Sequence, residues 1–275
     1  TAREAVIRPG LRRSGVPTLA PGARMEERDE ARESDALNGI AVAMMQFSPS
    51  VAILDEQTVL VEVGPSLRLF GGMRALCGKV RSVMDRLGIS TRLCAAPTGR
   101  GAWLLARFAS RRVVKLASLE RVLAALPMQA VPEVRPFGDW FSGLGCASVA
   151  DIRRLPRAGL KKRCGEHLLD TLDQAFGAAP EIFEWMEPPP AFAARIEFPD
   201  RIEDAQAMLF AANRLMLQLC GWLASRHLAA NALSLLLEHE RGRHAIEPTA
   251  VDIAFGEPAW QEAHIIRLVR ERLGR

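Results

Sequence analysis

Two groups of residues in the 275-residue chain have side-chain types and spacing that could do chemistry. The first is the adjacent acidic pair Asp55-Glu56, which Gln57 and Thr58 follow in the stretch SVAILDEQTVLVEVG. Adjacent carboxylates can hold a divalent cation such as Mg²⁺, so the pair could form a metal site. The alternative interpretation is a solvated turn without a metal.

The second group is a run of basic residues that contains no acid: Arg153, Arg154, Arg157, Lys161, Lys162 and Arg163. These cations bracket Pro156, so we expect them at the ends of two short helices that a tight turn joins. Such a turn presents backbone N–H groups and cations together, which binds phosphates without reading bases. The run therefore predicts a salt-dependent, sequence-independent affinity for nucleic acid, with a solvated helix face as the alternative.

The distribution of charge supports a partner of negative charge more than the formal net charge of +4 does. Between residues 63 and 119 there are eleven basic residues and a single acid, Asp85. Five cysteines, odd in number and without a CxxC pair, indicate neither a disulfide framework nor a zinc site and favour a reducing cytoplasm. No apolar run approaches the ~18 residues that a membrane span needs, so no membrane partner is expected.

The elements that must position the two groups can be read from periodicity. Two β-rich runs, 51–54 and 59–63, flank the polar tetrad 55–58 and predict a hairpin. Helices are expected at 34–47, 66–87 and 103–109, with a further strand at 90–95. This alternation predicts an α/β sheet with helices packed on it.

Beyond Leu119 the chain changes character. Short helices punctuated by Gly and Pro predict a small all-α module, and Pro188, Pro189 and Pro190 predict an extended linker. After the linker, strands are expected at 191–199, 232–239 and 250–255, and helices at 203–228 and 261–273. This βαββα order predicts a second α/β domain.

Residues 48–64 resemble, without gaps, the palm signature SPxVExxSIDEAYLDVT of Y-family translesion DNA polymerases. AVIRPGL at 5–11 is similar to the fingers segment AGVRRGM of that family, Ala96-Pro97 to the AP of its next palm strand, and 144–155 to the thumb motif LGIxTVxDLxxL. The resemblance implies an α/β (α+β) fold with the Y-family architecture. Its expected parts are a fingers remnant at 1–32, a palm at 33–118, a helical, helix-hairpin-helix-like thumb at 119–180, a linker at 181–189 and a βαββα little finger at 190–275.

The departures from the signature concern the chemistry. In the gapless register the catalytic Asp-Glu pair of the family falls on Gln57 and Thr58, and Asp55 and Glu56 lie on the Ser and Ile positions. Two-metal phosphoryl transfer needs both carboxylates, so the resemblance implies a catalytically inactive homologue without a cofactor. The alternative is an active nucleotidyltransferase that holds Mg²⁺ with Asp55 and Glu56, each displaced by roughly 6.6 Å along a regular strand.

Three further stretches, at 66–72, 96–107 and 151–165, resemble the ImuB subgroup of Y-family-like proteins. That subgroup implies a non-catalytic DNA-binding adaptor of a bacterial mutasome, which acts in damage-induced (SOS) mutagenesis in the cytoplasm, at the nucleoid. The implied partners are primer–template DNA, a sliding clamp, an error-prone C-family polymerase and a RecA-like accessory protein. The DNA contacts are assigned to the six thumb cations and to Arg100. The first palm strand is expected before Thr1 and a tail after Arg275, and no clamp-binding peptide of the QLPLW kind occurs in these residues.

Overall fold

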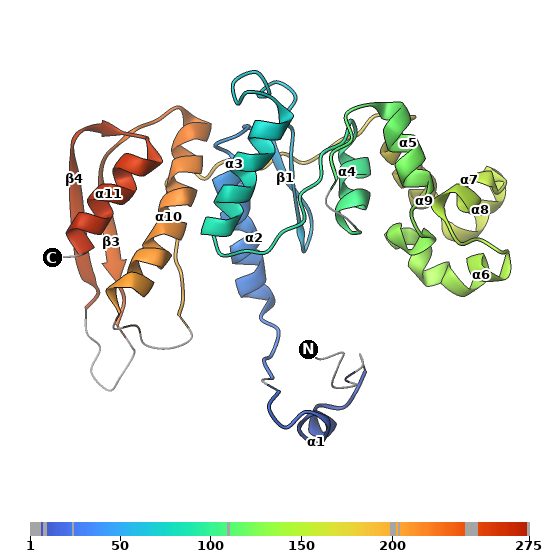
Figure 1. The fold of residues 1–275 in the computed structure, drawn as a ribbon, viewed down its shortest axis with the longest axis horizontal. Helices are drawn as coiled ribbons and strands as arrows, with labels where there is room; N and C mark the ends of the chain where they lie inside the picture. The colour runs from blue at the N-terminus through green and yellow to red at the C-terminus, as the bar shows by residue number, and fades with distance from the viewer. Residues whose placement is uncertain are drawn as a thin grey trace. The chain divides into compact units, whose positions relative to one another are not determined.

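The computed structural model describes residues 7, 10–23, 25–108, 111–198, 202, 204–239 and 247–273 (Figure 1). The chain divides into two units, Thr1–Asp35 and Ala36–Arg275. In the first unit a 3-10 turn, η1 (Arg13–Gly15), leads into the short helix α1 (Val16–Leu19), and neither contains a buried residue. The fingers-like segment at 5–11 falls largely outside the described residues.

The predicted hairpin is present. Strand β1 (Val51–Asp55) pairs antiparallel with β2 (Thr58–Val61), in a register that places Val51 opposite Val61. The turn is shorter than the predicted tetrad, because Asp55 and Thr58 still pair across it and leave two residues between the strands. A register irregularity lies between Ile53 and Asp55, and such bulges re-aim side chains near the end of a hairpin.

Two helices cover this hairpin. Helix α2 (Glu30–Met44) stops before Ser48-Pro49, as its sequence predicts, and α3 (Met73–Arg86) begins after Gly71 and Gly72. Both glycines have positive φ, at 76° and 93°, a conformation that side chains with a Cβ disfavour. A compact apolar core, which includes Met44, Val51, Leu76, Met84 and Leu87, joins the hairpin to the two helices.

The strands predicted at 90–95 and 191–199 are wrong for the described residues. The described strands form only two two-stranded sheets, β1-β2 and β3-β4. At 90–95 a single parallel bridge joins Ala95 to Arg112, and the residues before Ala95 have no neighbouring ladder in the described part of the chain. A strand is stable only where a neighbour continues the hydrogen-bond ladder, and periodicity alone does not reveal whether that neighbour is in place.

The helical module after Leu119 is confirmed, and it extends further toward the N-terminus than predicted. Its helices are α4 (Gly99–Ala106), α5 (Leu116–Ala124), α6 (Gly138–Gly143), α7 (Val149–Arg154), α8 (Arg157–Cys164) and α9 (His167–Ala175), with the 3-10 segments η2 (Met128–Ala130) and η3 (Pro132–Phe137). Leu104, Leu119, Phe141, Ile152 and Leu168 are fully buried in one shared core. Helix α4 therefore packs with the later helices.

The C-terminal elements are α10 (Ala205–Arg226), β3 (Ala230–Leu237), β4 (Thr249–Ala259) and α11 (Glu262–Leu273). β3 and β4 pair antiparallel, and Figure 1 shows α10 and α11 beside this sheet. Among the described residues the expected βαββα order is thus reduced to αββα. Residues 240–246, at the predicted hairpin tip, lie outside the described residues. A Cβ added to Gly221 of α10 would stand 2.0 Å from the carbonyl oxygen of Val42, so glycine is required where α10 meets α2.

One helix in the described residues, α10, has the length and apolar composition of a membrane-spanning segment. Its side chains Met216, Cys220 and Leu223 instead pack in a core with Phe255 and Ile265. Packing of α10 in this core therefore explains its apolar composition.

Residues 181–189, the predicted linker, form no helix or strand and make hydrogen bonds to other parts of the chain. The backbone N–H of Met186 donates to the carbonyl oxygen of Val51 at 2.7 Å. Further along, the carbonyl oxygen of Pro189 accepts from the Trp222 indole at 2.7 Å, and that of Pro188 accepts from Arg226 at 3.2 Å. The linker is thus bonded both to the hairpin and to α10.

Candidate nucleic-acid interface and the palm hairpin

The side chain of Asp55, at the end of β1, accepts hydrogen bonds from two distant side chains, Trp103 on α4 and Arg107 at the C-terminal cap of that helix. Its Oδ2 lies 2.7 Å from the indole Nε1 of Trp103 and 3.1 Å from Nη1 of Arg107. Its Oδ1 accepts the backbone N–H of Gln57 at 2.9 Å, and the hydroxyl of Thr58 also donates to the carboxylate. Four groups therefore saturate this carboxylate.

Opposing effects act on the pKa of Asp55. Partial burial raises it, whereas the hydrogen bonds from Trp103, Thr58 and Gln57 and the positive charge of Arg107 lower it. The lowering effects prevail, so the pKa of Asp55 lies below its usual value and the side chain is ionised at neutral pH. Its negative charge is already compensated by Arg107 within the chain.

The hairpin residues do not fit the Mg²⁺ pair of an active Y-family polymerase. In the gapless register with the family signature, Gln57 supplies an amide and Thr58 a hydroxyl at the two carboxylate positions, and Thr58 donates to Asp55. A metal on Asp55 would have to displace donors from an occupied carboxylate. Within the described residues no three His, Cys, Asp or Glu side chains are grouped so that they could hold a metal ion.

Helix α4 places the two donors. Trp103 and Arg107 are four residues apart and therefore share one face of the helix, with the Arg107 guanidinium 5.2 Å from the centre of the Trp103 rings. Thr98 caps α4, because its hydroxyl accepts the Gly101 N–H at 3.2 Å. The same hydroxyl donates to the Ala175 carbonyl oxygen of α9 at 2.8 Å and so attaches α4 to α9. A Cβ on Gly101 would lie 2.8 Å from Leu119 and 3.1 Å from the same carbonyl oxygen.

Arg100, one of the predicted DNA contacts, lies at the start of α4 among groups of its own chain. The Glu181 carboxylate accepts its backbone N–H at 2.5 Å and that of Gly99 at 2.8 Å, which satisfies amides that a helix N-terminus leaves free. The Arg100 guanidinium stands over the rings of Trp103 and Phe183 at 5.5 and 5.8 Å. These contacts attach the linker to the helix.

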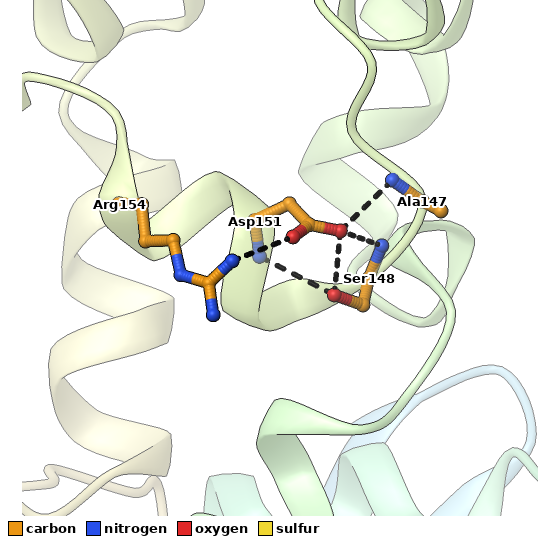
Figure 2. A network of polar contacts seen from close by, with 4 residues as sticks. All are labelled: Ala147, Ser148, Asp151 and Arg154. Carbon is orange, nitrogen blue, oxygen red and sulfur yellow. Dashed lines mark hydrogen bonds and ion pairs between the residues drawn. The ribbon is translucent and has the colours of Figure 1, made fainter.

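A tight turn joins the short helices α7 and α8, as the sequence predicts. Figure 2 shows the start of α7, where Ser148 and Asp151 form a capping box. Asp151 Oδ2 accepts the N–H groups of Ala147 and Ser148 at 3.1 and 2.9 Å and the Ser148 hydroxyl at 2.7 Å, and Arg154 reaches Oδ1 at 3.4 Å. The hydrogen bonds from Ser148 are the main reason that the pKa of Asp151 lies below its usual value.

Three of the six predicted thumb cations form ion pairs within the chain. Arg157 makes two parallel bonds to Asp173, at 2.9 and 2.6 Å, and Lys161 lies 2.6 Å from Glu166. Arg154 is paired with Asp151, as described above. These three charges are partly neutralised before any ligand arrives.

The other three thumb cations differ from one another. Arg153 stacks on the Phe176 ring at 3.7 Å, and Arg163 stands over Trp140 at 5.7 Å. Lys162 has no side-chain partner among the residues that the structure describes. The predicted cations thus lie on α7, on α8 and around the turn between these helices. Only some of them are free of ion pairs and could contact a phosphate.

Sequence reasoning missed the partners of these groups. Trp103 and Arg107 lie 48 and 52 positions from Asp55, and no local pattern connects them to the hairpin. Asp173 follows Arg157 by 16 positions, on another helix. The spacing of Trp103 and Arg107 on one helix face was readable, but what that face contacts was not.

No protein-family model matches this chain. Its fold is nevertheless similar to those of solved Y-family polymerases. A Dbh ternary complex superposes with a TM-score of 0.55 at 15% sequence identity, covering 99% of this chain and 81% of that one. DinB from Sulfolobus solfataricus superposes with a TM-score of 0.52 at 13% identity, covering 99% and 80%. The fold of this chain is thus similar to that of Y-family DNA polymerases.

The sequence is similar to a more particular protein. It is 26% identical over 261 residues to Protein ImuB of Caulobacter vibrioides, in strain NA1000 and in strain ATCC 19089, and the match covers 94% of this chain. The similarity to ImuB therefore extends over nearly the whole of this chain. The chain spans 57% of the length of these curated relatives.

Proposed function

We propose that the protein is a non-catalytic, DNA-binding adaptor of a bacterial mutasome that supports error-prone translesion synthesis after DNA damage. The observation that carries this proposal is the state of Asp55. The one aspartate near the family's metal-binding positions is saturated by Trp103, Arg107, Gln57 and Thr58. The similarity to ImuB supports the same interpretation.

The proposed partners follow from the fold and the resemblance. DNA binding is supported by the basic segments and by the likeness to polymerases, one of which was solved as a ternary complex. A sliding clamp, an error-prone C-family polymerase and a RecA-like protein are proposed from the ImuB resemblance. Such an assembly would act in the cytoplasm, at the nucleoid.

Primer extension tests the absence of catalysis. The purified protein is incubated with primer–template DNA and the four nucleotides, with Mg²⁺ and separately with Mn²⁺, beside an active Y-family polymerase. We expect no extension, because Gln57 and Thr58 cannot hold two metal ions between them. Template-dependent extension that Asp55→Ala abolishes would instead establish the active nucleotidyltransferase with Asp55 and Glu56 as metal ligands.

Fluorescence anisotropy with labelled primer–template DNA tests the other half of the proposal. We expect binding whose logarithmic affinity falls linearly with the logarithm of salt concentration. Absence of binding at low salt would leave an adaptor that contacts proteins alone.

A further inference from the structure

Seven exposed basic side chains between residues 63 and 119 form neither an ion pair nor a hydrogen bond with any residue that the structure describes, whereas the exposed Arg92 donates to the Arg107 carbonyl oxygen. The seven are Arg68, Arg74, Lys79, Arg81, Arg111, Arg112 and Lys115. They form two groups. The first four lie on α3 and the turn before it, and the last three lie between α4 and α5. This contrasts with the thumb, where Arg157 and Lys161 are already paired.

The three cations between α4 and α5 are carried by a backbone that is held in place. The N–H of Ala95 donates to the Arg111 carbonyl oxygen at 3.0 Å, and the N–H of Val113 donates to the Ala95 carbonyl oxygen at 2.8 Å. Val113 is 9% exposed and anchors the segment in the core beside α4. The segment therefore presents Arg112 and Lys115, about 10 Å apart at ~3.3 Å per residue, from an ordered backbone.

Exposed apolar side chains accompany these cations. Phe108 is 43% exposed, Val114 76% and Leu116 41%. No Asp or Glu occurs anywhere from Arg86 to Leu119 in the sequence, and the first turn of α5 has no acid. Phe108 is thus close in the sequence to cations that no described residue neutralises. Aromatic rings and cations together bind single-stranded nucleic acid, because bases stack on the rings while the cations hold phosphates.

We propose that this palm segment, defined as Phe108 together with Arg111, Arg112 and Lys115, binds single-stranded DNA. The three cations contact phosphates and Phe108 stacks on a base. The inference rests on the proposed DNA-binding function and moves the main contact from the thumb turn to the palm. DNA is favoured over an acidic protein because three cations lie within five positions and an exposed aromatic side chain lies close to them in the sequence.

Helix α3 offers a matched comparison surface. Arg74, Lys79 and Arg81 are also exposed and unpaired in the described residues, but Asp85 lies on the same exposed side of the helix and the helix exposes no aromatic ring. Reversing three charges on either surface changes the net charge of the protein equally. A difference in DNA affinity between the two variants therefore reports the location of the contact.

The experiment measures anisotropy of a fluorescein-labelled oligothymidylate of about 30 nucleotides over a range of salt concentrations. We expect the triple variant Arg111→Glu, Arg112→Glu, Lys115→Glu to bind at least about tenfold more weakly at about 100 mM salt. The slope of logarithmic affinity against logarithmic salt concentration should fall in magnitude by about 2, since each of three lost phosphate contacts contributes ~0.7 on a single strand. The triple variant Arg74→Glu, Lys79→Glu, Arg81→Glu stays within about twofold of the parent protein.

Further variants keep the test decisive. Phe108→Ala should weaken binding at least about fivefold on the single strand and less on duplex DNA, since stacking needs an unpaired base. Circular dichroism and thermal melting check that each variant folds. If the charge-reversed palm variant does not fold, the glutamine variant Arg111→Gln, Arg112→Gln, Lys115→Gln replaces it, with the same loss of slope expected.

The outcomes separate this inference from the proposed function. If the parent protein binds DNA and the two triple variants lose affinity equally, the palm segment is not the contact, although the DNA-binding function stands. If the parent protein binds neither the oligothymidylate nor primer–template DNA, the proposed function itself fails. If the palm variant loses affinity for a polyglutamate peptide but keeps it for DNA, the segment is a protein-docking surface and the inference is overturned.

Discussion

Asp55 in the hairpin and Asp151 at the start of α7 each accept hydrogen bonds from four groups, yet they stabilise the molecule in different ways. All donors to Asp151 lie between residues 147 and 154, so the network closes one turn of chain. Two donors to Asp55 come instead from α4, about 50 positions away. The same chemistry thus acts as a local helix cap in one region and as a tertiary clamp in the other.

This difference decides what each network requires. The cap needs only Ser148 and Asp151 at the correct spacing. The clamp needs α4 to be seated correctly on α9 and α5 before Trp103 and Arg107 can reach the hairpin. Changes that displace α4 should therefore cost more than changes that remove the cap.

The largest effect is expected from Gly101→Val. A Cβ at this position would already stand 2.4 Å from the Thr98 hydroxyl and 2.8 Å from Leu119, so α4 must move away from α9. We expect the free energy of unfolding to fall by about 3 kcal/mol, measured by urea denaturation. Gly143→Ala, where an added Cβ meets nothing within 4 Å, serves as the control and should change stability little.

A smaller loss is expected from Trp103→Phe, which keeps most of the ring but removes the N–H that Asp55 accepts. A hydrogen bond to a charged group contributes about 2 kcal/mol, so the free energy of unfolding should fall by about that amount. Trp140→Phe is the matched control, since the Trp140 indole N–H makes no hydrogen bond in the described residues. Equal losses from both variants would show that ring packing, and not the clamp, is being measured.

Ser148→Ala removes the side chain that caps α7. Its hydroxyl accepts the Asp151 N–H at 3.3 Å and donates to the Asp151 carboxylate. The expected loss is about 1 kcal/mol, typical of an N-cap serine. Ser142→Ala, at an exposed serine of α6, should be nearly neutral. If Ser148→Ala costs more than Trp103→Phe, the local network is the stronger of the two and the comparison is reversed.

The smallest expected effect concerns pH. The folded-state pKa of Asp55 lies below its unfolded value, so the stabilisation it provides is present above the unfolded pKa of ~3.9 and is lost as pH falls through the folded pKa. Asp55→Asn removes this titration. Its melting temperature should therefore decline less steeply than that of the parent protein on acidification below about pH 4. An unchanged slope would mean that the Asp55 clamp contributes nothing to acid sensitivity.

Much of the fold could be predicted from short stretches of sequence. The β-rich runs around Asp55, the proline and glycine breaks of the helical module and the long apolar pattern of α10 all act within a few residues of one another. The strands predicted at 90–95 and 191–199 were wrong because pairing depends on whether another segment lies alongside. The sequence predicts Asp55 to be a solvated turn residue or a metal ligand. In the structure it accepts hydrogen bonds from Trp103 and Arg107, which follow it by about 50 positions.

The amino-acid sequence by itself determined the order of the helices, the hairpin and the likeness to Y-family polymerases, including a gapless register that places Gln57 and Thr58 at the two carboxylate positions of the family signature. These properties depend on residue identity and on spacings of a few positions. Only the tertiary structure decided which charges are available. It paired Asp55 with Arg107 and Arg157 with Asp173, and it left Arg111, Arg112 and Lys115 unpaired among the described residues, because ion pairs form between side chains that folding brings within a few ångströms, whatever their separation along the chain.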